Sequence, residues 1–288
     1  MPLQNPQFID VAGIRTRYFE KGSGPTVLLL HGSNFGADLS ADCSINWNRN
    51  FDDLAKWCHV IAIDRLGQGF TDNPKTLADY TMAAVVEHIA DFIRVKGLKD
   101  VHLVGHSRGG YISCRCTLDH PELIKTCVII DSLTLAPGVG GMAKLMADPP
   151  EPRLTKDAQR WVMQRYSHGY DHIDDEWLDE LVAVADRPSY REAVSLVRQS
   201  PFETHLAKQK PETLQLVQDP GLGKPTLVIW GLNDPTALVE QGIELFKMIA
   251  KGEPRSQMHI FNRAGHFTYR EHPKEFDQVL RGWVAMWA

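Results

Sequence analysis

Ser107 lies in the pentapeptide Gly105-His106-Ser107-Arg108-Gly109, directly after a short apolar run. This G-x-S-x-G pattern is typical of a sharp turn from a strand into a helix, which presents the serine hydroxyl at the edge of a sheet. Glycines suit such a turn because the backbone is too crowded there for a Cβ atom. The pattern alone arises by chance in roughly one chain in ten of this size, so Ser107 needs partners elsewhere in the sequence.

Two such partners follow Ser107 along the chain. A serine hydroxyl is a weak nucleophile unless a base removes its proton and a third group orients that base. His266 lies beside Gly265 in a loop between an expected strand and helix, and Asp234 follows an apolar run. The order Ser, Asp, His is the one used by one class of serine hydrolases. We therefore predict that Ser107 is the nucleophile, His266 the base and Asp234 the orienting acid.

Each of these three residues also has a structural interpretation. Ser107 could simply form a turn between glycines. Asp234 precedes a proline and could cap a turn or helix, in which case Asp131, at the end of the preceding expected strand, is the substitute acid. His266 is one of 12 histidines.

An oxyanion that forms during acyl transfer needs two hydrogen-bond donors, and backbone amides supply them without ordering a side chain. The amide of Arg108, next to the nucleophile, is the first candidate. The second is the amide of Asn34, in the loop that follows the apolar run 26–31. Ser33 in the same loop is expected to add a side-chain hydrogen bond to substrate, and His31 to be a structural residue at the base of the loop.

These side chains must be positioned by a sheet. Continuously apolar runs are typical of parallel strands that are covered by helices on both faces; they occupy residues 26–31, 59–64, 101–104, 126–131 and 226–231. Helical patterns separate them, notably at 82–96 and 107–120, and residues 7–20 alternate as expected for an edge hairpin. The sequence therefore predicts an α/β fold with a mostly parallel central sheet.

One long interval interrupts this alternation. Residues 133–223 contain no convincing buried strand but carry helical patterns at 156–168, 174–186 and 189–199. We interpret this interval as a helical cap over the carboxyl ends of the strands, where ligands bind in open α/β folds. Residues 1–132 and 224–288 then form the core, which ends with a helix at 238–250, a strand at 257–262 and a helix at 273–287.

Composition narrows the class of protein. The 288 residues are 23% charged and 43% hydrophobic with a formal net charge of −5, which favours a globular protein and argues against a nucleic-acid partner. The five cysteines have no C-x-x-C spacing, so we expect free thiols rather than disulfides or a zinc site. Without a signal peptide or a long apolar stretch, we expect a cytoplasmic protein with no membrane partner. The proposed chemistry needs no metal or cofactor.

The motifs together resemble the α/β-hydrolase family over essentially the whole chain. In order they are His31-Gly32, the segment 64–72, the pentapeptide around Ser107, the Asp234 loop and Gly265-His266. The resemblance implies the α/β-hydrolase fold with an inserted helical cap. It also argues against the halide-releasing and epoxide-opening members, because these carry a carboxylate where this chain has Ser107.

Within the family the chain is most similar to the meta-cleavage product hydrolases, which cut a carbon–carbon bond in the diketo acids produced by aromatic ring fission. The similarity lies in Gly32-Ser33 and in the segment 47–50, Trp-Asn-Arg-Asn. The chain departs from that subfamily at His106, where asparagine is typical, and at Phe267, where tryptophan is frequent. The cap arginine that grips the substrate carboxylate there also lacks a clear counterpart.

Leu181 aligns near that cap arginine, and Arg160 and Arg165 lie earlier in the cap. We expect Ser33, His106 and Phe267 to contact substrate, because they adjoin the oxyanion loop, the nucleophile and the base. Further candidates for the cavity wall are Arg160, Arg165, Tyr166, His168, His172, Trp177 and Tyr269. A buried arginine facing Ser107 would favour an anionic diketo acid, and an apolar cavity would favour neutral esters.

Three functions remain open at this point. The resemblance implies hydrolysis of a carbon–carbon bond in a small carbonyl compound, through an acyl-enzyme or by direct attack of water. The same residues could serve a carboxylesterase or lactonase. In a different class, the fold could act as a cofactor-free oxygenase or a ligand-binding protein. The apolar last helix, with Trp283 and Trp287, leaves room for a homodimer.

Overall fold

A single eight-stranded sheet runs through the computed structural model, which describes residues 3–288. The strand order is β1-β2-β4-β3-β5-β6-β7-β8. The strands are β1 (Gln7–Val11), β2 (Ile14–Lys21), β3 (Thr26–Leu30), β4 (His59–Ile63), β5 (Val101–His106), β6 (Ile124–Ile130), β7 (Thr226–Gly231) and β8 (Gln257–Phe261). Strands β3 to β8 pair in parallel, whereas β2 is antiparallel to both β1 and β4. The predicted mostly parallel sheet and edge hairpin are confirmed.

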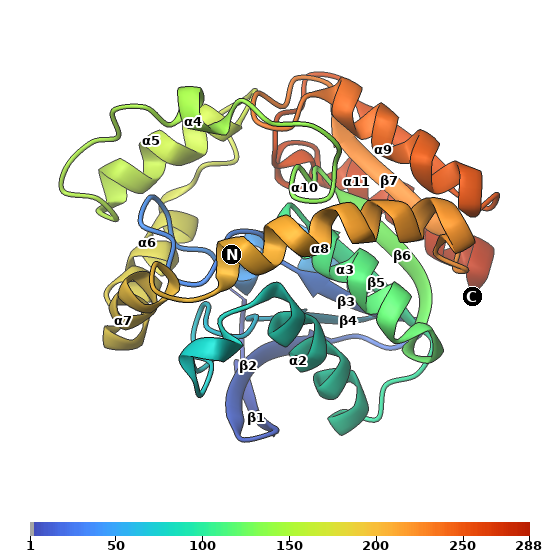
Figure 1. Cartoon of the computed structure of the whole chain (residues 1–288), viewed down its shortest axis with the longest axis horizontal. Coiled ribbons are helices and arrows are strands. Elements are labelled where there is room, and N and C mark those ends of the chain that lie inside the picture. Colours follow the sequence, from blue (N-terminus) through green and yellow to red (C-terminus); the bar gives the residue numbers. More distant parts are fainter. Residues whose placement is uncertain (1–2) are drawn as a thin grey trace.

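Helices cover both faces of this sheet (Figure 1). Alternate residues of each strand face opposite cores, since successive side chains in a strand point to opposite sides. Leu28 and Leu103 pack with α2, α3 and α9, and Leu29 and Val104 pack with α1 and α11. The helices of the core are α1 (Phe51–Leu54), α2 (Met82–Val95), α3 (Arg108–Asp119), α9 (Val239–Gly252), α10 (Thr268–Glu271) and α11 (Pro273–Trp287). Short 3-10 turns lie at Ser44–Trp47, Leu77–Asp79 and Pro121–Leu123.

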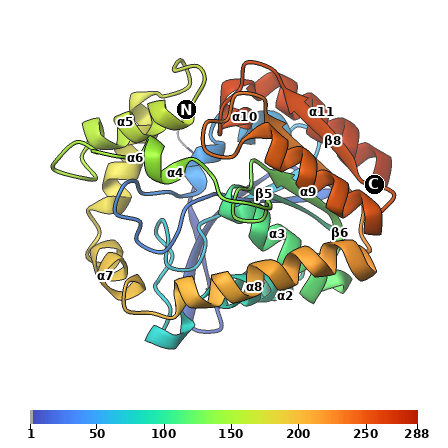
Figure 2. The same cartoon turned by 45° about the horizontal axis from the view of Figure 1, so that its top comes forward.

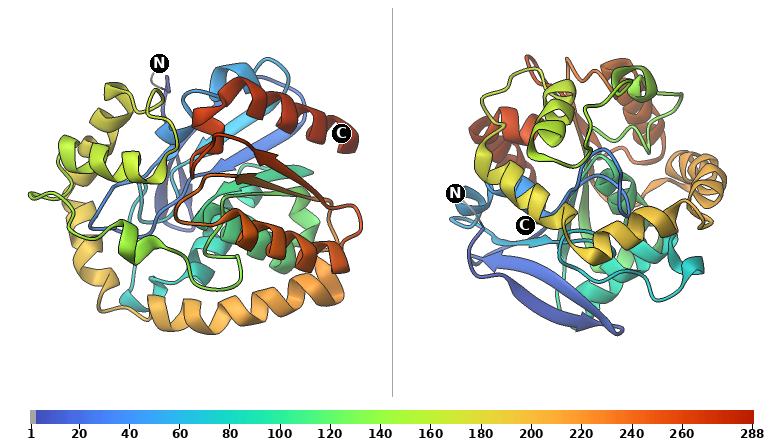
Figure 3. Two further views of the ribbon diagram at one scale, coloured as in Figure 1. Left: turned by 90° about the horizontal axis from the view of Figure 1, so that it is seen from above. Right: turned by 90° about the vertical axis from the view of Figure 1, so that its left-hand side faces the viewer.

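Between β6 and β7 the chain forms only helices in the described structure. These are α4 (Met142–Leu145), α5 (Lys156–Tyr166), α6 (Asp175–Ala185), α7 (Pro188–Val197) and α8 (Phe202–Leu216), with a π-helical segment at Val217–Gly221. Helices α4 to α7 gather at one end of the molecule, beside the loops that follow the central strands (Figures 2 and 3). The division of the chain into a core and a cap at residues 133–223 stays a prediction.

Helix α8 differs from the other helices of this interval. It runs along α2 and α3, as Figure 2 shows, and Thr213 accepts a hydrogen bond from Arg115 Nη1 at 3.3 Å. This helix was not predicted from the sequence. Only Phe202 and Thr213 of its residues are buried, and Pro211 interrupts its pattern, so the apolar periodicity is weak.

All five cysteines are free and buried. None of the helices within residues 3–288 is long and apolar enough to cross a membrane.

Candidate active site

The turn between β5 and α3 holds Ser107 in a strained conformation. Its φ of 54° and ψ of −120° lie outside the regions that residues with a Cβ atom usually adopt. Close packing explains the two glycines of the motif: a Cβ atom on Gly105 would lie 2.0 Å from the Gly109 carbonyl oxygen, and one on Gly109 2.6 Å from that of His31. The Ser107 amide donates to the Ile130 carbonyl at 2.8 Å. The sheet therefore fixes the serine at the carboxyl end of β5.

Asp234 and His266 are brought together by the loops after β7 and β8. His266 Nδ1 lies 2.6 Å from Asp234 Oδ2. The other carboxylate oxygen, Oδ1, accepts from the amides of Thr236 and Ala237 and from the Thr236 hydroxyl, at 2.7 to 3.0 Å. One oxygen of Asp234 therefore caps its own turn and the other contacts the histidine. The contacts thus fit both interpretations of Asp234 from the sequence, a cap of the turn and a partner of His266.

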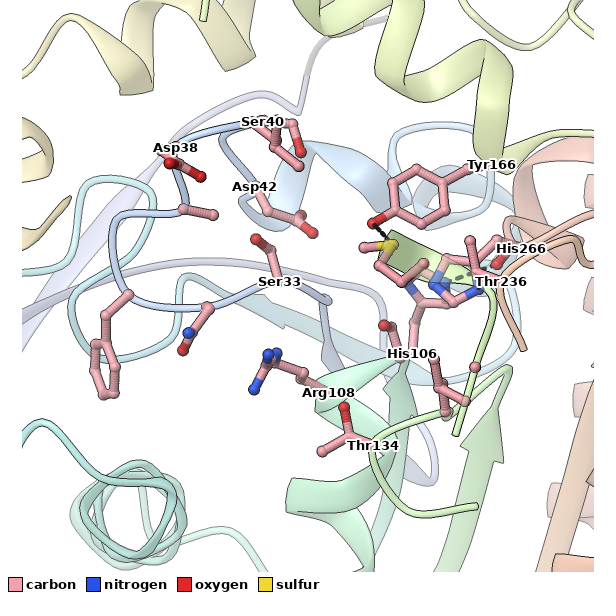
Figure 4. A pocket seen from close by; sticks show the side chains of 18 of the residues that line it. Ser33, Asp38, Ser40, Asp42, His106, Arg108, Thr134, Tyr166, Thr236 and His266 are labelled. Atoms are coloured by element: carbon pink, nitrogen blue, oxygen red, sulfur yellow. Dashed lines mark hydrogen bonds between the residues drawn. The ribbon is translucent and has the colours of Figure 1, made fainter. Parts of the chain in front are cut away.

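The imidazole of His266 is held on several sides. Its backbone amide donates to the Tyr166 carbonyl at 2.8 Å, and the Tyr166 ring stacks on the imidazole with centroids 4.9 Å apart. Because a carboxylate accepts hydrogen bonds, the Asp234 contact places the proton of a neutral His266 on Nδ1. Nε2 is then left as an acceptor on a ring that lines the same cavity as Ser107. Figure 4 shows His266, Tyr166 and Thr236 together at one end of this cavity.

His106, the residue before the serine, supports the histidine loop. Its Nε2 lies 2.8 Å from the His266 carbonyl oxygen, which can only accept, so this nitrogen carries the proton. Nδ1 lies 3.4 Å from the Tyr269 hydroxyl. Burial, together with the nearby His266, lowers the pKa of His106 far below its usual value and favours the neutral ring. His106 lines the cavity, but both of its ring nitrogens already have protein partners, and its contact with substrate stays a prediction.

Asp131, the alternative acid suggested by the sequence, forms no hydrogen bond with the His266 imidazole among the described residues. Its Oδ1 accepts from the Gly231 amide at 2.7 Å, and its Oδ2 lies 3.1 Å from the Thr268 hydroxyl. Burial and the neighbouring Asp234 raise the pKa of Asp131 well above its usual value. The neutral acid is therefore favoured at Asp131.

Two side chains of the segment after β4 donate hydrogen bonds to the backbone of the loop after β3. Arg65 donates to the carbonyls of Gly32 and Ser33, and Gln68 donates to the Asn34 carbonyl at 2.8 Å. In a trans peptide the C=O and the following N–H point in opposite directions. The amides of Ser33 and Asn34 therefore point away from Arg65, on the side of the loop that lines the cavity.

The cavity has a volume of about 600 Å³. All the predicted site residues except Asp234, which lies behind His266, contribute to its wall; they are Ser33, Asn34, His106, Ser107, Arg108, His266 and Phe267. Among residues 3–288 no cluster of three or more His, Cys, Asp or Glu side chains is arranged to hold a metal ion.

Neither Arg160 nor Arg165 lines this cavity, whereas Arg198, at the end of α7, does and pairs there with Asp38 at 2.7 Å. Arg160 pairs with Asp175 at 2.6 Å, and Arg165 packs over the Trp161 ring at 4.0 Å from its centroid. Leu181 is fully buried in the cap. Of the other cap candidates, Tyr166 lines the cavity.

Several residues of the site were missed by the sequence analysis. Thr236, Arg65 and Gln68 act through hydrogen bonds to the residues already named, and Lys210 and Asp42 lie on the cavity wall. The segment 64–72 was noticed as a family motif, but its contact with the oxyanion loop depends on the pairing of β3 with β4.

Comparisons with known proteins place this geometry in context. A family model described as "alpha/beta hydrolase fold" matches residues 25–273. The chain is 29% identical, over 96% of its length and 68% of the relative's, to the dihydrolipoyllysine-residue acetyltransferase component of an acetoin cleaving system from Cupriavidus necator.

Two further comparisons concern proteins of nearly the same length. The chain is 26% identical to a 2-hydroxymuconate semialdehyde hydrolase of Pseudomonas sp. strain CF600, over 99% of this chain and 96% of that protein. A solved structure of a serine hydrolase involved in carbazole degradation superposes with a TM-score of 0.78 at 26% identity, covering 98% of this chain and 99% of that one.

Proposed function

The chain belongs to the α/β-hydrolase family, and from that premise we propose that it is a hydrolase whose catalytic triad is Ser107, His266 and Asp234. One observation carries the proposal. His266, joined to Asp234 at 2.6 Å, lines the same cavity as a serine that is held at a strained turn between β5 and α3. Strain at such a turn costs of order 1–3 kcal/mol and persists where the surrounding structure enforces it.

The chemistry follows from these positions. His266 Nε2 accepts a proton from the Ser107 hydroxyl, or from a water in its place, as the oxygen that loses this proton attacks the substrate carbonyl carbon. Negative charge then develops on the carbonyl oxygen, where the amides of Arg108 and Asn34 stabilise it. The resulting imidazolium is stabilised by Asp234, and it returns the proton to the leaving group. With an acyl-enzyme, water then releases the acid by the same proton transfers.

We propose that the substrate is a small carbonyl compound, with carbon–carbon cleavage of a ring-fission diketo acid as the first candidate. The volume of about 600 Å³ suits a small molecule, since such sites span roughly 300–1,000 Å³. Support for the substrate class comes from the relative that is a 2-hydroxymuconate semialdehyde hydrolase.

Hydrolysis of esters or lactones is the second candidate. It uses the same nucleophile, base and oxyanion donors. One observation favours it: Leu181, which aligns near the substrate-gripping arginine of the carbon–carbon hydrolases, is buried in the cap and does not line the cavity.

A direct comparison of substrates tests the proposal. The wild-type protein and Ser107→Ala would be incubated with 2-hydroxymuconate semialdehyde and with short 4-nitrophenyl esters, and kcat/KM measured for each. We expect turnover by the wild type and a loss of about 10⁴-fold or more in Ser107→Ala. Faster ester turnover would replace the first candidate by the second. If Ser107 neither reacts with a fluorophosphonate nor supports turnover of any of these substrates, the serine mechanism is wrong.

A further inference from the structure

The side chain of Arg108 has no hydrogen-bond or ion-pair partner among the described residues. Its backbone opens α3 directly after Ser107, and its side chain lies on the cavity wall (Figure 4). The atom Nη1 is buried without a partner. The contact that holds the guanidinium is the fully buried ring of Phe202 from α8, whose centroid lies 5.2 Å from Cζ. The positively charged guanidinium of Arg108 therefore lines the cavity and packs on an aromatic ring instead of pairing with a polar group.

Arg108 is half-buried, and the buried arginines of the protein are treated differently. Arg17 pairs with Asp64 and Glu180. Arg65 donates to two backbone carbonyls, and Arg270 donates to the carbonyls of Asn46 and His172. Burying a cation without partners is costly. The exception at Arg108 therefore points to a partner that arrives from outside the protein.

Acidic side chains near the cavity do not fill this role. Asp38 is paired with Arg153 and Arg198, at 3.2 and 2.7 Å. Asp42 accepts from Asn46 at 2.6 Å, and in Figure 4 it lies on the opposite side of Ser33 from Arg108. Glu203, on the exposed side of α8, attracts the guanidinium through space but forms no ion pair with it.

A second cation extends the positive side of the cavity. Lys210, also from α8, lies on the same wall, and its Nζ donates to the Leu133 carbonyl at 3.3 Å. This single long bond leaves the ammonium able to contact a ligand, since it has three donors.

We infer that the Arg108 side chain binds a carboxylate of the substrate, so that the enzyme selects carbonyl compounds that also carry an anionic group. This inference rests on the proposed function and deepens it by naming the substrate class. A guanidinium fits a carboxylate through two parallel hydrogen bonds. Asp42 repels the same carboxylate, so the anionic end of the substrate lies toward Arg108 and the remainder toward His266 and Tyr166. One residue thus serves twice, with its amide at the oxyanion and its side chain at the anionic end.

A matched pair of esters tests this inference. The probes are mono(4-nitrophenyl) adipate and its methyl ester, which differ in one negative charge. We expect the wild type to prefer the anionic ester in kcat/KM, and Arg108→Met to reduce that preference by about 10- to 100-fold, mainly through KM. Arg108→Lys should restore part of the preference. The matched control is Arg115→Met, which removes one positive charge from the same helix outside the cavity and should change the preference by less than about twofold.

A binding measurement separates this inference from the proposed function. Calorimetric titration of Ser107→Ala with the anionic ester should give an affinity that falls by a similar factor when Arg108→Met is added, and the neutral ester should show no such fall. A wild type without preference, equal losses on both esters, or unchanged affinity in the double variant would overturn the role of Arg108. If the esters bind in this manner but are never hydrolysed, the serine mechanism fails and the anionic site stands.

Discussion

The cavity wall that carries Ser107 and His266 and the wall that carries Arg108 and Lys210 differ in how their polar groups are satisfied. On the first, Asp234 Oδ1 accepts three hydrogen bonds and His266 is held through its ring, its amide and its carbonyl. On the second, Arg108 has no polar partner among residues 3–288 and Lys210 has one long bond.

This difference separates two tasks. Hydrogen bonds that end on backbone atoms hold the reacting groups in one geometry whether or not a substrate is present, which is what catalysis by preorganised groups requires. Polar groups that remain unpaired are instead available to a ligand, and a ligand that lacks the matching charge leaves them unsatisfied. We therefore propose that the first wall sets the rate of the reaction and the second wall its selectivity for substrates.

The largest effect is expected from the acid of the first wall. Asp234→Asn keeps the size of the side chain but leaves it a single acceptor oxygen. It can therefore no longer accept hydrogen bonds both from the turn at Thr236 and from His266 Nδ1. We expect kcat to fall by about 10⁴-fold. Asp131→Asn is the matched control, because Asp131 is the neighbouring carboxylate and its oxygens accept hydrogen bonds from the Gly231 amide and the Thr268 hydroxyl, whereas those of Asp234 contact the imidazole. Steady-state kinetics at pH 7 distinguishes the two; a comparable loss in both variants would place the charge of Asp131 in the mechanism.

The oxyanion loop gives the next largest effect. Arg65→Met removes the donors that hold the carbonyls of Gly32 and Ser33 and so frees the amide of Asn34 to turn. We expect a loss of about 10²-fold in kcat, the usual effect of losing one oxyanion donor. The surface variant Arg94→Met serves as the control. A change confined to KM would assign Arg65 to substrate binding instead.

Asp277 shows that an unpaired buried atom can have a cause other than a ligand. Its Oδ2 has no partner, and burial raises its pKa to about 7 despite a 2.9 Å hydrogen bond from Asn50. The folded protein therefore binds this proton more tightly than the unfolded chain. The contribution of Asp277 to stability is therefore fully present below the ordinary carboxyl pKa and is lost as the pH rises toward about 7.

Asp277→Asn removes that dependence. We expect the variant to match the wild type near pH 4 and to exceed its free energy of unfolding by about 1 to 3 kcal/mol near pH 8. Urea unfolding across this range measures the difference. A constant offset at all pH values would mean that the pKa of Asp277 is the same in the folded and unfolded states, and its unpaired oxygen would then need another explanation.

The sequence predicted the parts of the molecule that depend on local patterns. Strands β3 to β7 are continuously apolar because both faces are covered, and this pattern is visible without a structure. Close contact around Gly105 and Gly109 likewise leaves a local signature. Family motifs located the loops that carry Asp234 and His266, which the fold then brings within 2.6 Å of each other.

The parts that could not be predicted depend on contacts between distant segments. From the sequence, only the backbone amide of Arg108 was predicted to have a role, as an oxyanion donor. The position of its side chain depends on Phe202 from α8, a helix without a clear apolar pattern. The sequence therefore indicated Arg160 and Arg165 as candidate cationic anchors, whereas Arg160 pairs with Asp175 and Arg165 packs over Trp161. Similarly, the role of Arg65 follows from strand pairing and not from its neighbours in sequence.

The smallest effect concerns the contact between the cap and the histidine. The Tyr166 ring stacks on His266 at an interplanar angle of 23°, while its backbone carbonyl accepts the His266 amide. Tyr166→Ala removes the ring and keeps the backbone bond, so we expect kcat to fall by about 3- to 10-fold, the equivalent of one aromatic contact. Tyr166→Phe keeps the ring and loses only the hydroxyl contact with Met142, and it should stay close to the wild type. A similar loss in both variants would place the hydroxyl in contact with substrate and move Tyr166 from the wall that sets the rate to the wall that sets selectivity.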